Sequence, residues 1–334
     1  MQTAAALRRT ELRERSVGAF WLSGLQGRSD RPRHPGGALF AAGLSLAWLL
    51  LCGMGPYRPA GLGSAALGTA DAVLASGVGG AALYANPAGM SQVQHGVIEG
   101  GFARSGHAGS GAPFVSFVDS TSDWGLAAGV GYSGELGWGV DAPKRSGQDL
   151  RMGLSAGGQT ESGRLLLGGA ARYLSVQREG GPNVEGWTSD FGVLVGMQAL
   201  RLGAVVHNAL QLDPREAPRR VGVAAALVAT QLIAEVGGSW GVGNRSPLTS
   251  GDAIGQSYRA GLAYMVGAEG LQLRAGYQFD QIVSGDPTHH WVCAGLSWRT
   301  PSLAFDLGGG LDASNNNELM VSASVTLLVP THVE

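Results

Sequence analysis

Residues 271–280 read LQLRAGYQFD, and apolar and polar side chains alternate along this stretch. Because successive side chains of a β-strand point to opposite faces, this period of two predicts a strand with one apolar and one polar face. The two faces are Leu271, Leu273, Ala275, Tyr277 and Phe279 against Gln272, Arg274, Gly276, Gln278 and Asp280.

The same alternation recurs along the chain, for example in residues 303–312 and 319–327. Each stretch is close to the ~9–11 residues with which a tilted strand crosses a bilayer. About fourteen such segments can be placed. They start near Gln92, Gly111, Asp123, Asp149, Gly163, Trp187, Leu200, Arg219, Thr230, Gln256, Gly270, His289, Pro301 and Leu319.

The links between these segments alternate in length. Long polar links such as 208–218 and 241–255 follow odd-numbered segments, whereas tight turns, including one at residues 120–122, follow even-numbered ones. Long outer loops and short periplasmic turns are typical of up-and-down barrels in the bacterial outer membrane. Only a closed sheet leaves no unpaired edge in lipid. We therefore predict an all-β fold, a closed antiparallel transmembrane β-barrel of about 14 strands over residues 91–330.

The polar faces of the predicted strands contain charged residues of both signs. An Arg or Lys on the lipid face costs ~2–4 kcal/mol at mid-membrane, so we expect the charges to face the lumen and the apolar faces to contact membrane lipid. Ion pairs that satisfy one another and bind nothing are the simplest role for them. The lumenal residues are Arg151, Asp190, Glu235, Arg259, Arg274, Asp280, Asp306 and Asp312.

Tryptophans near the predicted strand ends suit the aromatic girdles at a membrane interface. For each of them, ordinary core packing is the alternative. They are Trp124, Trp187, Trp240, Trp291 and Trp298.

Composition excludes several classes of protein. The 44% hydrophobic content and net charge of -2 do not suit a disordered chain or a nucleic-acid-binding protein. Cys52 and Cys293 are too few for a disulfide framework or a cysteine zinc site. His289 and His290 are adjacent and would point to opposite faces of a strand, so we expect no metal shared between them. No cofactor motif stands out.

Two enzyme-like patterns occur and neither has its required setting. Residues 153–157, GLSAG, match a nucleophile elbow, which needs a strand–turn–helix, and residues 129–134, GVGYSG, match a dinucleotide fingerprint, which needs a following helix. Both lie in alternating strand patterns, so we expect no enzyme.

The first ninety residues have a different character. A basic flank precedes an apolar run over residues 38–51. This run is shorter than a membrane-spanning helix needs, and the two together suit a secretory signal. We assign residues 31–60 to a signal peptide, with a lipoprotein signal at Cys52 as the alternative, and leave residues 1–30 out of the fold prediction as a leader. Residues 61–90 are rich in Gly and Ala and have no place in the barrel wall. They predict a hatch in the lumen or periplasm, with a short helix over residues 65–74 and a helical turn beginning at Pro87.

The stretch 61–90, ending in Asn86-Pro87-Ala88-Gly89, resembles the N-terminal segment of the FadL-like outer-membrane proteins and of the PorV-like barrels. Residues 219–223, 258–262 and 273–277 resemble later strands of these families. The resemblance implies a 14-stranded barrel, hatch or gate residues at Asn86, Pro87, Ala88 and Gly89, and passive uptake of hydrophobic small molecules such as fatty acids or aromatics. The alternative it implies is a non-transporting PorV-like barrel that anchors or hands over secreted proteins, with secretion-system proteins as partners.

Overall fold

The computed structural model describes residues 63–105, 110–137, 145–160, 163–178, 183–210, 218–242, 254–267, 270–282, 288–314 and 318–329. The predicted leader and signal peptide lie outside these residues. Within them, no helix is both long and apolar enough to cross a bilayer.

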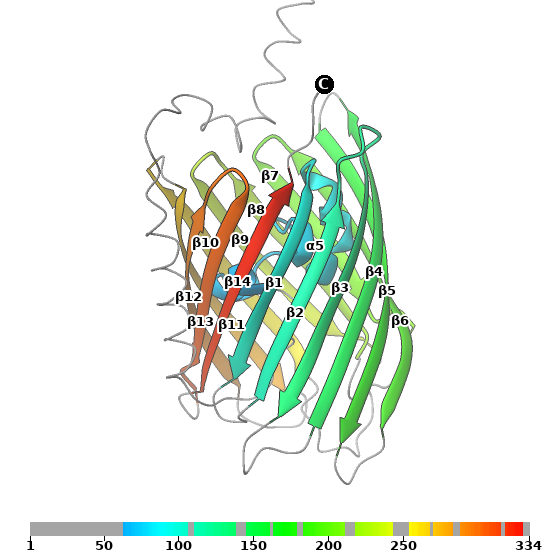
Figure 1. The fold of residues 1–334 in the computed structure, drawn as a ribbon, viewed down its shortest axis with the longest axis vertical. Helices are drawn as coiled ribbons and strands as arrows, with labels where there is room; N and C mark the ends of the chain where they lie inside the picture. Colours follow the sequence, from blue (N-terminus) through cyan, green and yellow to red (C-terminus); the bar gives the residue numbers. More distant parts are fainter. Residues whose placement is uncertain are drawn as a thin grey trace, which may run out of the picture. The chain divides into compact units, whose positions relative to one another are not determined.

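Fourteen antiparallel strands close into a barrel in which each strand pairs with its neighbours in the sequence and β14 pairs with β1 (Figure 1). This confirms the predicted fold. The strands are β1 Gly96–Ser105, β2 Ser110–Asp119, β3 Leu126–Gly137, β4 Arg145–Thr160, β5 Gly163–Arg178, β6 Val184–Met197, β7 Leu200–His207, β8 Arg220–Val228, β9 Leu232–Gly241, β10 Ile254–Val266, β11 Leu271–Ile282, β12 His289–Arg299, β13 Leu303–Asp312 and β14 Leu319–Val329.

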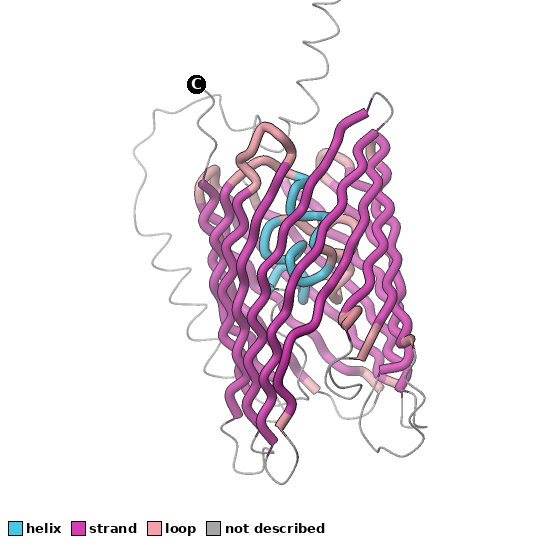
Figure 2. The backbone as a smooth tube through the Cα atoms, turned by 90° about the vertical axis from the view of Figure 1, so that its right-hand side faces the viewer, coloured by secondary structure: helices cyan, strands magenta, loops and turns pink. Residues whose placement is uncertain are grey.

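Three short helical elements precede the wall and lie inside the ring of strands (Figure 2). They are α4 Gly63–Gly68, α5 Gly79–Ala85 and the 3₁₀ helix η2 Pro87–Gln92. We call residues 63–92 the hatch. The expected helix over 65–74 is wrong beyond Gly68, because Ala70 and Asp71 take left-handed backbone angles, φ 55° and 59°. The helical turn predicted at Pro87 is confirmed as η2.

The links distinguish the two ends of the barrel. The links after β7 and β9 span residues 208–219 and 242–253, whereas those after β4 and β6 span only 161–162 and 198–199. We call these ends the long-loop end and the short-turn end. The tight turn expected at 120–122 is wrong, because the link from β2 to β3 covers residues 120–125. Its Ser120 side chain bonds to the backbone of Val93 and His95, so this link holds the exit of the hatch.

The wall shows the expected two faces. Large apolar side chains such as Leu273, Tyr277 and Val325 are exposed on the outside, whereas their polar neighbours are buried inside. Trp124, Trp187 and Trp298 are exposed. Trp291 is not a girdle residue: it faces inward, is 4% exposed, and packs with Leu67 of the hatch. Among the described residues, four of the five apolar clusters include a hatch residue, and the fifth, Leu174 with Val176, lies on β5 alone.

Two ladders of the wall are irregular. Strands β10 and β11 shift register between Ile254 and Gln256, and the ladder between β2 and β3 has a gap. Strands β2 and β3 pair at Ser110 and Gly111 and again from Phe114 onward, but not at Ala112 and Pro113. Proline has no backbone N–H to donate, so it suits a break in a ladder. This break lies toward the long-loop end of the two strands.

Candidate functional site

Glycines on the inner face of the wall form the surface that receives the hatch. At each of ten positions, a Cβ atom would approach or overlap atoms of the hatch. At Gly276 it would lie 2.6 Å from the Ala70 nitrogen, and at Gly295 2.9 Å from the Gly68 Cα. The hatch backbone therefore packs directly on the wall backbone. We call these residues the glycine belt: Gly131, Gly153, Gly168, Gly192, Gly203, Gly222, Gly261, Gly276, Gly295 and Gly308, on β3 to β8 and β10 to β13.

Polar side chains complete the ring on strands outside the belt. On β14, the hydroxyl of Ser322 lies 2.8 Å from that of Ser64 in α4. On β1, the Glu99 carboxylate lies beside Gly63 and Gly80. On β9, Glu235 binds the hatch directly. The hatch therefore contacts the wall around the barrel rather than hanging from one side.

Residues 74–77, which we call the hatch loop, are held by side chains from three directions. The Glu235 carboxylate accepts hydrogen bonds from the amides of Ala75, at 3.1 Å, and Ser76, at 2.8 Å. The Gln92 amide donates to the Gly77 carbonyl at 2.7 Å and accepts from Arg201. Bonds to a charged acceptor are roughly twice as strong as neutral ones, so Glu235 is the main anchor.

Asn86 supplies the third anchor of the hatch loop. Its side-chain amide donates to the Leu74 carbonyl at 3.1 Å and to the Val193 carbonyl of β6 at 3.2 Å. Its side-chain oxygen accepts from the Ala88 amide at 3.2 Å and so caps η2, in which Pro87 occupies the first turn. One side chain thus joins the hatch loop, η2 and the wall.

The four residues predicted as a gate are all buried. Pro87 and Ala88 pack against Gly168 and Gly192 of the belt, and a Cβ at Gly89 would lie 2.7 Å from the Gly77 carbonyl oxygen. The hatch loop and the Asn86–Gly89 turn therefore contact each other. A movement of the hatch loop would change the contacts of this turn.

A network of charged side chains fills the lumen beside the hatch, on β4 to β7. Arg151 lies 3.2 Å from Asp149 and 3.0 Å from Asp190, and Arg172 lies 2.8 Å from Asp149. His207 lies 3.2 Å from Asp190. Each buried charge has partners of opposite sign, as burial requires. We call these five residues the ionic network.

Arg151 joins the ionic network to the hatch. Its guanidinium donates to the Tyr84 carbonyl at 3.2 Å and lies 4.6 Å from the centre of the Tyr84 ring. Burial raises the pKa of the Tyr84 phenol above its ordinary value, so the ring stays neutral at physiological pH. A cation over the face of a neutral aromatic ring is favourable.

The remaining residues predicted to face the lumen lie elsewhere on the inner wall. Arg274 and Asp306 form a buried pair at 2.8 Å, and the Gln278 amide donates to Asp280. Arg259 is half-buried. The structure thus groups Arg151 with Asp190 and Arg274 with Asp306, while Glu235 binds the hatch.

Toward the long-loop end, the inner face also carries apolar side chains. Strands β1, β2, β12 and β14 point buried, uncharged side chains inward there. We call them the apolar strip: Ala103, Ala112, Phe114, Trp291 and Met320. The β2–β3 break at Ala112 and Pro113 borders this strip. The inner face at this end therefore combines apolar side chains with the buried carboxylates of Asp312 and Glu318.

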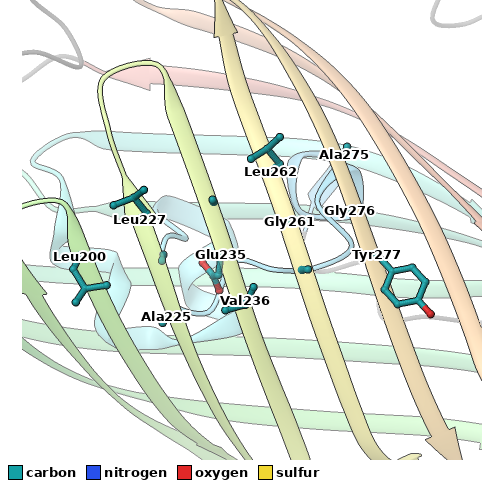
Figure 3. A pocket seen from close by; sticks show the side chains of 13 residues that line it. Leu200, Ala225, Leu227, Glu235, Val236, Gly261, Leu262, Ala275, Gly276 and Tyr277 are labelled. Carbon is teal, nitrogen blue, oxygen red and sulfur yellow. The ribbon is translucent and has the colours of Figure 1, made fainter.

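Two apolar grooves lie on the wall between β6 and β11, of about 570 and 700 Å³. Figure 3 shows the larger side chains of Leu227, Leu262 and Tyr277 in the first, separated by the small residues Gly261 and Gly276. Both glycines belong to the belt and contact Thr69 of the hatch on their inner side. Only one backbone layer separates the groove from the hatch, and the ladders across it are continuous.

The patterns rejected as enzyme motifs have a structural explanation. Ser155 lies within β4, and Gly131 and Gly153 belong to the belt, where Leu83 packs against both. Sequence reasoning missed the belt and the contact of Glu235 with the hatch loop. A signal for the belt is visible in the chain, because an inward Arg precedes an inward belt glycine by two residues on five strands. The pairs are Arg151/Gly153, Arg201/Gly203, Arg220/Gly222, Arg259/Gly261 and Arg274/Gly276.

No protein-family model matches the chain, and no curated protein matches it in sequence. Solved structures do share its architecture. The CymD monoaromatic hydrocarbon channel is 16% identical with a TM-score of 0.61, and the match covers 84% of this chain and 100% of that one. A TodX monoaromatic hydrocarbon channel with the S2 deletion is 14% identical, with a TM-score of 0.58, covering 83% and 100%. A Pseudomonas aeruginosa FadL homologue is 12% identical, with a TM-score of 0.54, covering 84% and 100%. The chain therefore has the FadL-like barrel fold.

Proposed function

We propose that the protein is an outer-membrane channel for passive uptake of hydrophobic small molecules of the fatty-acid or aromatic class, and that the hatch is its gate. The observation that supports this most is the way the hatch is held. It lies inside the barrel, where it packs on the glycine belt and is bonded by wall and hatch side chains that include Glu235, Asn86, Arg151 and Ser322. A plug of this kind can move without breaking the ladders of the wall.

The outer surface supports a place in the outer membrane. Its exposed side chains include many large apolar residues, and each spanning strand is paired on both edges. A closed sheet with an apolar outside satisfies both requirements of the bilayer, since no backbone group meets lipid unpaired. The solved channels with this fold are described as hydrocarbon channels, which favours the same class of cargo here.

The apolar strip gives such a cargo a surface to follow. Ala103, Phe114 and Met320 are buried on the inner face, so a cargo would reach them only if the side chains that cover them moved aside. Burying an apolar ligand against them gains roughly 25 cal/mol for each Å² removed from water. The cargo would then leave past a displaced hatch loop.

One observation limits the transport proposal and leaves the second candidate, a barrel that anchors or hands over secreted proteins, as the alternative to be tested. The ionic network occupies the lumen on the β4–β7 side, and fixed ion pairs give an apolar cargo nothing to bind. In that case the hatch would be a permanent plug. The two candidates differ in whether anything crosses the barrel.

The test is uptake by liposomes that contain the purified protein. A labelled fatty acid and a labelled alkyl-aromatic are added outside, with empty liposomes as the control, and the wild type is compared with a deletion of residues 63–92. We expect the wild type to exceed the control and the deletion to change the rate. Uptake equal to that of empty liposomes would exclude transport of these probes, and uptake unaffected by the deletion would exclude the hatch as gate.

A further inference from the structure

A histidine and two carboxylates meet at the long-loop end, away from the hatch. His289 is the first residue of β12, Asp312 is the last of β13, and Glu318 directly precedes β14. One imidazole nitrogen and one oxygen of each carboxylate lie within 4.8 Å of one another. We propose that these three residues bind a divalent transition-metal ion, with Zn²⁺ as its best representative.

The backbone fixes these residues relative to one another. The Asp312 amide donates to the Glu318 carbonyl at 2.8 Å, and the Ala313 amide donates to the His290 carbonyl at 2.8 Å. The ends of β12, β13 and β14 are thereby joined beside the three side chains. The pairing of the three strands brings the donor groups together, so the site is formed before an ion binds.

The orientation of the Asp312 carboxylate is also set. Its Oδ1 atom accepts from the His290 amide at 3.2 Å, the Ser314 amide at 3.0 Å and the Ser314 hydroxyl at 2.6 Å. Its Oδ2 atom is turned toward His289 Nδ1. Such bonds to the outer oxygen are what orients a metal-binding carboxylate. Oδ2 is therefore the atom offered to an ion.

The charge of the cluster favours a divalent cation. Asp312 is 1% exposed and Glu318 is 6% exposed, so two carboxylates are nearly buried within 4.8 Å of each other. Like charges this close repel strongly where water is scarce. The imidazole of His289 carries at most one positive charge, whereas a divalent ion would place two beside the carboxylates.

The donor set selects among ions. One imidazole nitrogen with carboxylate oxygens suits Zn²⁺, whose bonds to these atoms are ~2.0–2.2 Å long, whereas Ca²⁺ and Mg²⁺ take oxygen ligands. The side chain of His289 is 24% exposed, which leaves a path for the ion from the long-loop end. Bound there, the ion would clamp the ends of three neighbouring strands. This role is independent of the proposed transport.

The chain offers a matched control for testing the site. His290 is adjacent to His289 but points to the outer wall, where its imidazole lies 2.6 Å from the Tyr277 hydroxyl. Removing His290 deletes an imidazole at the same strand end without touching the proposed ligands. His290→Ala should therefore keep the metal, whereas His289→Ala and Glu318→Gln should lose it.

The experiment measures Zn²⁺ binding to the detergent-purified full chain after treatment with a chelator, by calorimetry and equilibrium dialysis. We expect one Zn²⁺ per chain, preference over Ca²⁺, and a higher midpoint of thermal unfolding with Zn²⁺. His289→Ala and Glu318→Gln should each weaken binding at least tenfold, in samples whose circular dichroism shows an intact barrel. No binding by the wild type, or binding that survives in both ligand variants, would overturn the proposal and leave His289 and Asp312 as an ion pair only.

Discussion

At the residue scale, the absence of side chains at wall glycines explains how the hatch fits inside a barrel of 14 strands. The chain has 56 glycines, and ten of them form a belt on the inner wall where a side chain would meet the hatch. Without a Cβ, the wall approaches the hatch backbone to van der Waals contact. In each Arg-x-Gly pair, an inward arginine lies two residues before a belt glycine. Each of these strands therefore places a positive charge beside the position where the hatch backbone packs.

The belt can be tested by adding one methyl group. Gly276→Ala would place a Cβ 2.6 Å from the Ala70 nitrogen, and overpacking of this kind costs about 1–3 kcal/mol. We expect faster amide hydrogen exchange in residues 69–72. The control is Gly309→Ala on the neighbouring hairpin, where the new atom would meet its nearest neighbour at 3.5 Å. Equal exchange in the two variants would contradict the belt.

Among the residues that the structure describes, Glu235 is the charged side chain that bonds directly to the hatch loop. In Glu235→Gln, one oxygen can still accept a hydrogen bond, but the new NH₂ group faces an amide donor, which leaves that donor unpaired at a cost of about 1–3 kcal/mol. Hydrogen exchange at Ala75 and Ser76 should accelerate. Glu185→Gln, which removes a carboxylate that pairs with exposed Tyr173, should leave both amides protected. Unchanged exchange in the Glu235 variant would show that other contacts hold the loop.

At the element scale, the hatch has no independent stability. Helices α4 and α5 have six and seven residues, far fewer than the ~12–15 that an isolated helix needs. They persist because the wall buries them. The order of the hatch therefore depends on the contacts of its connecting segments, and above all on Asn86.

Removing the Asn86 side chain should loosen these segments together. Asn86→Ala deletes the cap of η2, worth about 0.5–2 kcal/mol, and leaves the carbonyls of Leu74 and Val193 without this donor. We expect higher ion conductance in planar bilayers and faster proteolysis within the hatch. Gln94→Ala removes an exposed amide just beyond η2 and should change neither. If the two variants behave alike, Asn86 does not hold the gate.

The elements that the sequence predicted well are the strands, whose outer face contacts lipid and whose inner face contacts polar groups. Each of the fourteen predicted segment starts falls within four residues of a strand start, because lipid outside and polar contacts inside impose the period of two. Predictions failed where tertiary contacts decide. Trp291 belongs to the inward face and packs on Leu67, and the first helix stops at Gly68 because residues 69–70 lie against the backbone of Gly276.

At the scale of the whole molecule, the barrel and the hatch form one packed unit. The contacts that hold the hatch join residues far apart in the chain, such as Ser76 with Glu235 and Ser64 with Ser322. No local pattern marks such pairs, which is why the lumenal position of Glu235 was predictable while its role was not. The same holds for the ionic network, whose residues were predictable as lumenal charges but not as neighbours of Tyr84.

The central claim is that the hatch must move for cargo to pass. The hydroxyls of Ser64 and Ser322 lie 2.8 Å apart, so cysteines at both positions are placed to form a disulfide between α4 and β14. The background would carry Cys52→Ala and Cys293→Ala, so that only the engineered pair can oxidise.

The decisive measurement is uptake of a labelled fatty acid by liposomes containing the Ser64→Cys, Ser322→Cys variant, first oxidised and then reduced in the same preparation. The account predicts at least a tenfold loss of uptake on oxidation and recovery on reduction, with no effect of redox state on the protein that retains both serines. Equal uptake in the oxidised and reduced states would contradict it, because cargo would then pass while α4 stays fixed to β14.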